Sequence, residues 1–408
     1  MNVRTALIAG LVALVSFAVY AESSVVTISD PRFVIPSAIS LERHGDLDLD
    51  EYRAWIYGEN LLSYREVNGH THNYFPYGTT LMITPVIWLT DIATGRDLEA
   101  RAQRGSLPQL EKTLAAAIVA IAAALMFLIA LEVLGSVGLA LAAAAVLAFG
   151  TSTWSVASRA LWMHGPMMVL LGLTVLLALH SSRRPILAGL MALPLGFGFV
   201  VRPTAAAAIV CFGVWVAWQR RRQLPLFVGI GAVIGAAFFL ANKRIFGDWL
   251  PEYYQAGHFG EGNKFFEAFA GNLVSPARGL LVFSPVLLLV FLRRRKLTPL
   301  EWAAAGTIVV HLVLISRFFH WWGGYSFGPR LFSDIAPLAV FLMLPVLKDL
   351  RKPVIGGAFA VLLAASMFIH WRGATVYETW LWNAVPNSVD TNPTRLWDWG
   401  DLMFLRSW

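Results

Sequence analysis

Side chains able to act as acids, bases and ligands are concentrated in one polar stretch, residues 23–78, directly after the first apolar segment. The stretch contains Ser29-Asp30-Pro31-Arg32. Because proline fixes its own backbone and restricts the residue before it, Asp30 is held in a defined direction. A carboxylate fixed beside a membrane segment could act as general base on an acceptor hydroxyl. Aspartate followed by proline is also a favoured helix start, so a purely capping role for Asp30 stays open.

Two further patterns in this stretch contain residue types that bind metals. Alternation with leucine would place Asp46, Asp48 and Asp50 on one side of an extended chain, where carboxylates could bind a divalent cation. The same run also fits a solvated turn followed by a helix that begins at Asp50. His70 and His72 form a His-x-His pair, which alone is a weak metal signal. The sequence therefore predicts no metal or other cofactor, with a divalent cation as an unsupported alternative.

Basic and aromatic side chains recur where later apolar runs begin or end. A charged side chain at a membrane edge is costly unless it is paired or used. Arginine suits a lipid-linked phosphate there, because its planar fork pairs two oxygens and keeps its charge. The predicted substrate-binding residues are Arg32, Tyr74, Arg159, His164, Arg202, Arg278, His320, Trp322 and Arg330. Snorkelling, interhelical hydrogen bonds and contacts with bulk lipid headgroups are the alternatives for the basic residues.

The composition is that of an integral membrane protein. Hydrophobic residues make up 57% of the 408 residues, charged residues make up 14%, and the mean hydropathy is +0.62. The single cysteine excludes an internal disulfide and a multi-cysteine metal site. The net charge of +7 comes from short basic links between apolar runs, which indicates membrane topology rather than nucleic-acid binding. Aromatic residues that flank these runs, such as Trp162 and Tyr253, are predicted to be interface anchors.

Apolar periodicity predicts an all-α polytopic protein with eleven transmembrane helices. Each predicted span is near the ~20 residues that cross a ~30 Å hydrocarbon core. The spans are residues 5–20, 113–134, 138–153, 161–180, 185–201, 203–219, 224–242, 278–292, 298–316, 331–347 and 353–370. Val19-Tyr20-Ala21 resembles a signal-peptide cleavage site, so removal of the first segment is the alternative to its predicted retention.

Basic clusters predict the orientation of these spans. They fall on alternate links, at residues 183–184, 220–222, 293–296 and 348–352, which the positive-inside rule assigns to the cytoplasm. The amino terminus is then inside, and residues 22–112 form a large first outer loop. The apolar stretch Thr79–Thr90 is too short to span, so it is predicted to lie along the outer face or to re-enter from it.

Four motifs resemble the GT-C superfamily of membrane glycosyltransferases, close to the protein mannosyltransferases and lipid A aminoarabinose transferases that use polyprenyl-phosphate sugars. They are Ser29-Asp30-Pro31-Arg32, Ser158-Arg159, residues 275–280 (SPARGL) and residues 322–330 (WGGYSFGPR). The resemblance covers roughly residues 5–370. It implies a first outer loop with membrane-parallel helices that covers a cavity, and a catalytic base at Asp30. Many relatives have two adjacent acidic residues at this point, whereas this chain has Asp30-Pro31.

The predicted organisation is a GT-C-like transmembrane domain, residues 1–370, followed by a short outer tail, residues 371–408. The predicted function is transfer of a sugar, with inversion, from a polyprenyl-phosphate donor to a glycan, lipid or protein acceptor. The reaction would take place at the outer face of the bacterial cytoplasmic membrane, with Asp30 as base and no nucleic acid as partner. A lipid-linked glycan flippase or transporter is the main alternative, although transporters place charges near the membrane midplane and often contain repeats that are not evident here. A non-catalytic scaffold is the third.

Overall fold

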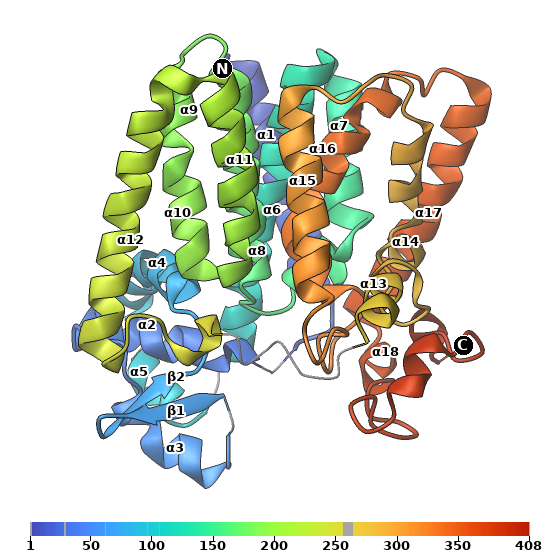
Figure 1. The fold of residues 1–408 in the computed structure, drawn as a ribbon. Coiled ribbons are helices and arrows are strands. Elements are labelled where there is room, and N and C mark those ends of the chain that lie inside the picture. The colour runs from blue at the N-terminus through green and yellow to red at the C-terminus, as the bar shows by residue number, and fades with distance from the viewer. Residues whose placement is uncertain are drawn as a thin grey trace.

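Long helices form a bundle, and a smaller layer of short helices, a hairpin and loops covers one end of it, the loop end (Figure 1). The computed structural model describes residues 2–27, 30–61, 63–95, 97–105, 107–255 and 264–407. The bundle contains α1 (Val3–Glu22), α6 (Pro108–Leu134), α7 (Val137–Phe149), α8 (His164–His180), α9 (Ile186–Leu190), α10 (Ala192–Val201), α11 (Ala206–Gln219), α12 (Leu224–Phe246), α14 (Leu280–Phe283), α15 (Pro299–Ile315), α16 (Ala336–Leu347) and α17 (Pro353–Thr375). The loop end contains α2 (Val34–Arg43), α3 (Arg53–Gly58), β1 (Tyr64–Val67), β2 (His70–Asn73), α4 (Gly78–Thr94), α5 (Leu98–Ala102), α13 (Phe265–Val274) and α18 (Glu378–Leu381).

Helical structure occupies all eleven predicted spans. Within the described ranges, five helices are long and apolar enough to cross a membrane alone: Val3–Glu22, Pro108–Leu134, Arg221–Phe246, Arg330–Leu347 and Pro353–Thr375. Most other spans are shorter apolar helices. The span predicted at 278–292 is α14 followed by a 3-10 segment, Pro285–Leu292, because proline cannot continue the α-helical hydrogen bonding. A mostly helical fold is confirmed, whereas the count of eleven crossings stays a prediction.

The two ends of the bundle differ in charge. The amino terminus and the four basic links, which join α8 to α9, α11 to α12, α14 to α15 and α16 to α17, all lie at the end opposite the loop end (Figure 1). The carboxy terminus lies at the loop end. This arrangement matches the alternation that the basic clusters predict.

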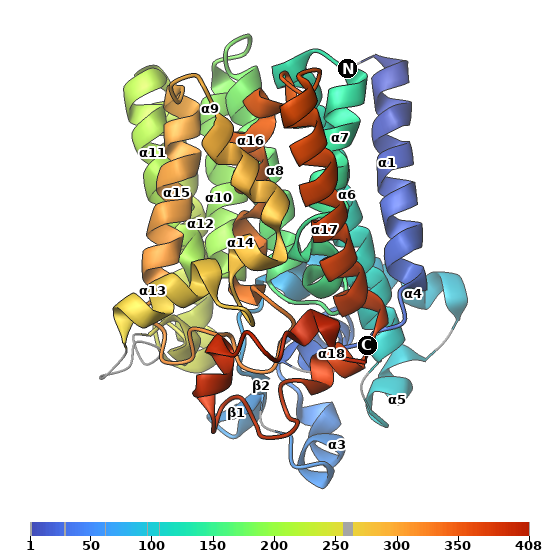
Figure 2. The same ribbon diagram turned by 90° about the vertical axis from the view of Figure 1, so that its right-hand side faces the viewer.

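The first helix is bonded into the bundle at its carboxyl end. Helix α1 packs along α6 (Figure 2), and the buried Tyr20 hydroxyl donates to the Ala148 carbonyl at 2.9 Å. The Lys112 Nζ donates to the carbonyls of Ala21 and Ser23, each at 2.9 Å. Cleavage after Ala21 would remove partners of buried groups, so these bonds favour retention of the segment.

The first loop folds around its own apolar cluster. Phe33, Ile39, Trp55 and Ile83 are buried in it, where α2 packs against α4 across the loop end (Figure 1). Strands β1 and β2 pair antiparallel through the turn Asn68-Gly69, whose positive φ angles of 53° and 84° are those of an Asn-Gly hairpin turn. The short helix predicted at Thr79–Thr90 is α4, which extends to Thr94.

The carboxy-terminal segment packs as a second part of the loop-end layer (Figure 2). Helix α17 continues through residue 371 to Thr375, so the segment starts five residues later than the predicted boundary. Its centre is the fully buried Trp382, whose ring lies 5.6 Å from the Arg278 guanidinium and 4.2 Å from that of Arg395. The contact with Arg278 joins the segment to the bundle, whereas the contact with Arg395 lies within the segment.

Candidate active site

A cavity of about 820 Å³ lies where the bundle meets the loop-end layer. Its walls come from the start of the first loop, the β2–α4 connection, the starts of α8 and α11, the loop after α12, and the link after α15. The predicted site residues that line it are Asp30, Tyr74, His164, Arg202, His320 and Arg330. Residues separated by up to 300 positions in the sequence therefore meet in one cavity beside the bundle.

Asp30 and Arg330 form an ion pair in this cavity. The Arg330 Nη1 donates to the Asp30 Oδ2 at 3.2 Å. The Asp30 side chain is 35% exposed and the Arg330 side chain 13% exposed. The Arg330 guanidinium also lies 4.3 Å from the Trp162 ring, a cation–π contact that holds it in place. The predicted base and a predicted phosphate ligand are thus direct neighbours.

Glycines determine the conformation of the link between α15 and Arg330. Gly323 and Gly328 have φ angles of +73° and +57°, which side chains other than glycine adopt rarely. A Cβ on Gly323 would lie 3.3 Å from the Arg330 Nε, and one on Gly328 would overlap the Phe283 ring at 2.5 Å. The glycines therefore allow the link to fold tightly beneath the arginine.

A second charged cluster lies deeper in the cavity wall. The Arg202 Nη1 donates to the Asp334 Oδ1 at 2.8 Å and lies 2.6 Å from the His164 Nδ1, which also contacts Asp334. The side chains of His164, Arg202 and Asp334 are only 4%, 3% and 2% exposed. The three residues come from the start of α8, the end of α10 and the turn before α16, so they join three bundle elements.

Aromatic side chains form the wall beside these charges. The rings of Tyr74, Phe75 and Tyr253 lie 5.4–5.8 Å from one another. Burial raises the pKa of the Tyr253 phenol above its ordinary value, so its hydroxyl stays protonated at neutral pH and can donate a hydrogen bond. Tyr253 and Trp162 line the cavity, where the sequence predicted interface anchors.

Arg159 is placed away from the cavity. It is fully buried, and its guanidinium donates to the carbonyls of Tyr20 and Ser23, the latter at 3.0 Å. These carbonyls belong to the last turn of α1 and the residue that follows it. In this structure Arg159 secures the end of α1 rather than facing the cavity predicted to hold substrate.

Arg278 and Trp322 also form hydrogen bonds within the protein. The Arg278 guanidinium donates to the Trp322 carbonyl at 2.8 Å, the Gly324 carbonyl at 3.1 Å and the Asn383 Oδ1 at 2.6 Å. The Trp322 indole donates to the Asp390 Oδ1 at 2.7 Å. Of these residues, Gly324 and Asp390 line the cavity, so Arg278 and Trp322 support a cavity wall instead of facing the cavity. Arg32 lies near the buried Glu111 and is likewise outside the cavity lining.

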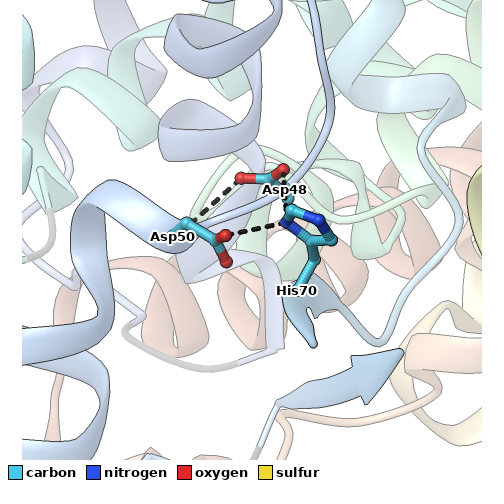
Figure 3. Close-up of side chains that lie close together, drawn as sticks. All are labelled: Asp48, Asp50 and His70. Atoms are coloured by element: carbon cyan, nitrogen blue, oxygen red, sulfur yellow. Dashed lines mark hydrogen bonds and ion pairs between the residues drawn. The ribbon is translucent and has the colours of Figure 1, made fainter. Parts of the chain in front are cut away.

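The hairpin brings together the metal-ligand types that the sequence indicated. Asp48, Asp50 and His70 have ligand atoms within 4.8 Å of one another, and Figure 3 shows His70 directed at both carboxylates. The Asp50 Oδ2 lies 2.8 Å from the His70 Nδ1, while its Oδ1 lies 2.8 Å from the Arg53 Nη2. Although burial opposes it, hydrogen bonds from the Thr71 amide and His70 lower the pKa of Asp50, and the Asp50 contact raises the pKa of His70. A guanidinium and an imidazole thus already contact this carboxylate, and these contacts hold the hairpin.

The site contains functional candidates that the sequence prediction did not select. Asp334 enters an apolar span four residues after Arg330, and a carboxylate at such a position is a recognisable signal. Tyr253 and Asp390 gave no comparable signal, since both lie among other aromatic or polar loop residues. Their placement depends on how distant loops pack against the bundle.

Comparison with known proteins identifies the fold. No protein-family model and no curated protein sequence matches the chain. The structure matches the crystal structure of ArnT from Cupriavidus metallidurans bound to undecaprenyl phosphate, with a TM-score of 0.52 and 14% sequence identity. The match covers 94% of this chain and 66% of that chain. The chain therefore shares the fold of ArnT, which confirms at the level of the fold the resemblance predicted from the four motifs, and its long apolar helices are those of an integral membrane protein.

Proposed function

We propose that this protein transfers a sugar from a polyprenyl-phosphate donor to an acceptor hydroxyl at the outer face of the bacterial cytoplasmic membrane. The observation that carries the proposal is the Asp30–Arg330 pair. A carboxylate suited to proton abstraction and an arginine suited to phosphate meet at 3.2 Å in one cavity, within an ArnT-like fold. The ArnT structure contains undecaprenyl phosphate, which supports a lipid phosphate as the ligand of this cavity.

The proposed reaction is a single displacement at the anomeric carbon. Asp30 takes the proton of the acceptor hydroxyl while the acceptor oxygen forms the new bond to the sugar. The bond between the anomeric carbon and the phosphate oxygen breaks, and its electron pair stays on the lipid phosphate. Attack from the face opposite the leaving group inverts the configuration. Phosphate is a good leaving group when cations neutralise it, so Arg330 and Arg202 replace a general acid.

The aromatic and polar walls fit the remaining parts of the substrates. Tyr74, Phe75 and Tyr253 offer ring faces and hydroxyls to a sugar. His320 and Asp390 line the cavity from other segments and offer polar contacts to donor or acceptor hydroxyls. The internal bonds of Arg278 and Trp322 hold Asp390 in place. The identity of the sugar does not follow from these contacts.

The experiment is a donor screen with the purified protein in lipid nanodiscs. Radiolabelled polyprenyl-phosphate sugars are added one at a time, and both sugar transfer and free lipid phosphate are measured. Consumption of one donor by the wild type, lost in Asp30→Asn and kept in Asp46→Asn, would support the proposal. Asp46 is the matched control because it is a carboxylate of the same loop outside the cavity lining. Binding without consumption of any donor would favour a transporter instead.

A further inference from the structure

Two arginines line the cavity, and each is paired with one aspartate. Arg330 pairs with Asp30 and Arg202 with Asp334, at 3.2 Å and 2.8 Å. Asp334 is four residues after Arg330 in the same 3-10 turn, Arg330–Ile335. One turn therefore carries the arginine of the first pair and the aspartate of the second.

The two pairs differ in burial. The Arg202 and Asp334 side chains are 3% and 2% exposed, whereas those of Arg330 and Asp30 are 13% and 35% exposed. A charge left without its partner in a buried position is strongly destabilising, so the Arg202–Asp334 pair stays together. A pair in contact with solvent exchanges partners at little cost. The deep pair is a fixed part of the cavity wall, and the shallow pair can open.

The described residues engage the Arg202 guanidinium at its Nη1 alone. Both Asp334 and His164 contact its Nη1. The Nε and Nη2 groups have no hydrogen-bond or ion-pair partner among the described residues. That edge presents two parallel N–H groups, the arrangement that matches two oxygens of one phosphate. Because Arg202 lines the cavity, a phosphate bound there can reach its side chain.

We propose that Asp334 is a positioning residue that holds Arg202 by its Nη1 and so dedicates the Nε–Nη2 edge of Arg202 to the lipid phosphate. The proposal rests on the proposed lipid-phosphate ligand of the cavity. Arg202 then provides a fixed contact to the phosphate, and Arg330 adds a second contact after its ion pair with Asp30 has opened. His164 is the third member of the deep cluster and closes it on the α8 side.

The test compares two lipids that differ only in the phosphate. Full-length Asp334→Asn in nanodiscs is titrated with undecaprenyl phosphate and, separately, with undecaprenol. The expected result is a loss of affinity for undecaprenyl phosphate of about tenfold, the effect of one charge-assisted hydrogen bond, with undecaprenol affinity unchanged. Asp349→Asn is the matched control, because it removes a carboxylate bonded to a cation at 2.6 Å on an exposed link. Equal loss for both lipids, or no loss for either, would overturn the proposal.

A second variant keeps the test valid if Asp334→Asn folds poorly. In Arg202→Gln/Asp334→Asn both buried charges are removed, so thermal stability is expected to recover relative to the single variant. Undecaprenyl phosphate affinity is expected to stay low, because the phosphate-binding edge is gone. Wild-type affinity in the double variant would overturn the proposal. The binding assay does not depend on turnover. If Asp334→Asn loses affinity for undecaprenyl phosphate as expected but the wild type transfers no sugar, the transferase function is refuted and the role of Asp334 stands.

Discussion

Replacement of Asp30 by asparagine should strengthen binding of undecaprenyl phosphate while it slows transfer by orders of magnitude. Asp30 occupies the Arg330 guanidinium at 3.2 Å, so a phosphate must displace the carboxylate before it can pair with Arg330. Asparagine removes the competing charge and also the repulsion between carboxylate and phosphate. Both effects favour the phosphate. Removal of the deep carboxylate at Asp334 has the opposite expected sign, because that residue holds its arginine for the phosphate.

The magnitude follows from the exposure of the pair. Exposed ion pairs contribute ~0.2–1 kcal/mol, and this partly buried pair, with Asp30 35% and Arg330 13% exposed, is placed near the upper end of that range. Since 1.4 kcal/mol corresponds to tenfold in affinity, a contribution near the upper end predicts a dissociation constant that falls by up to about fivefold. The assay is titration of nanodisc-embedded protein with undecaprenyl phosphate, with undecaprenol as the reference lipid. Weaker binding of undecaprenyl phosphate by Asp30→Asn would refute the idea that Asp30 competes for Arg330.

The remaining predictions concern the parts of the fold that support the cavity. Arg278→Ala should destabilise the packing of the carboxy-terminal segment on the bundle by on the order of 3 kcal/mol, and new protease cleavage after α17 would show it. Arg278→Lys should be cleaved as well, because one ammonium cannot replace the several N–H groups of the arginine fork. The contact with Asp50 raises the pKa of His70 in the folded protein. The His70–Asp50 contact therefore stabilises the fold fully below the ordinary histidine pKa, and this stabilisation is lost as pH rises through the raised pKa of His70. His70→Gln should therefore lower the melting temperature more near about pH 6 than near about pH 9, and an equal loss at both would contradict this. The intact mass of the purified protein should include α1, and cleavage after Ala21 would show that its bonds do not protect it.

The helical architecture was predictable because apolar length and basic links are local properties of a membrane protein. Every predicted span contains helix, and the basic clusters gather at one end of the bundle as the positive-inside rule requires (Figure 1). The limits of individual elements were less predictable. Proline at residue 285 divides one span into two short helical segments, and α17 continues beyond the predicted boundary at residue 370.

The candidate site was predictable in part. Asp30 and Arg330 were selected from motifs, yet their direct contact depends on how the first loop folds back onto the bundle, which no local pattern specifies. Arg159 and Arg278 belong to equally distinctive motifs, but the structure uses them to bind backbone carbonyls. An arginine beside a membrane span has the same sequence signature whether it binds substrate or the end of a helix.

The most direct test of the central claim is the rate of a single turnover with the donor that the screen identifies. Wild type, Asp30→Asn and Asp46→Asn are each saturated with that donor, and sugar transfer to the acceptor is followed. If Asp30 is the general base, its replacement should slow transfer by about 10²–10⁴-fold, with the control at the wild-type rate and lipid-phosphate binding retained. Transfer by Asp30→Asn at the wild-type rate would contradict the account.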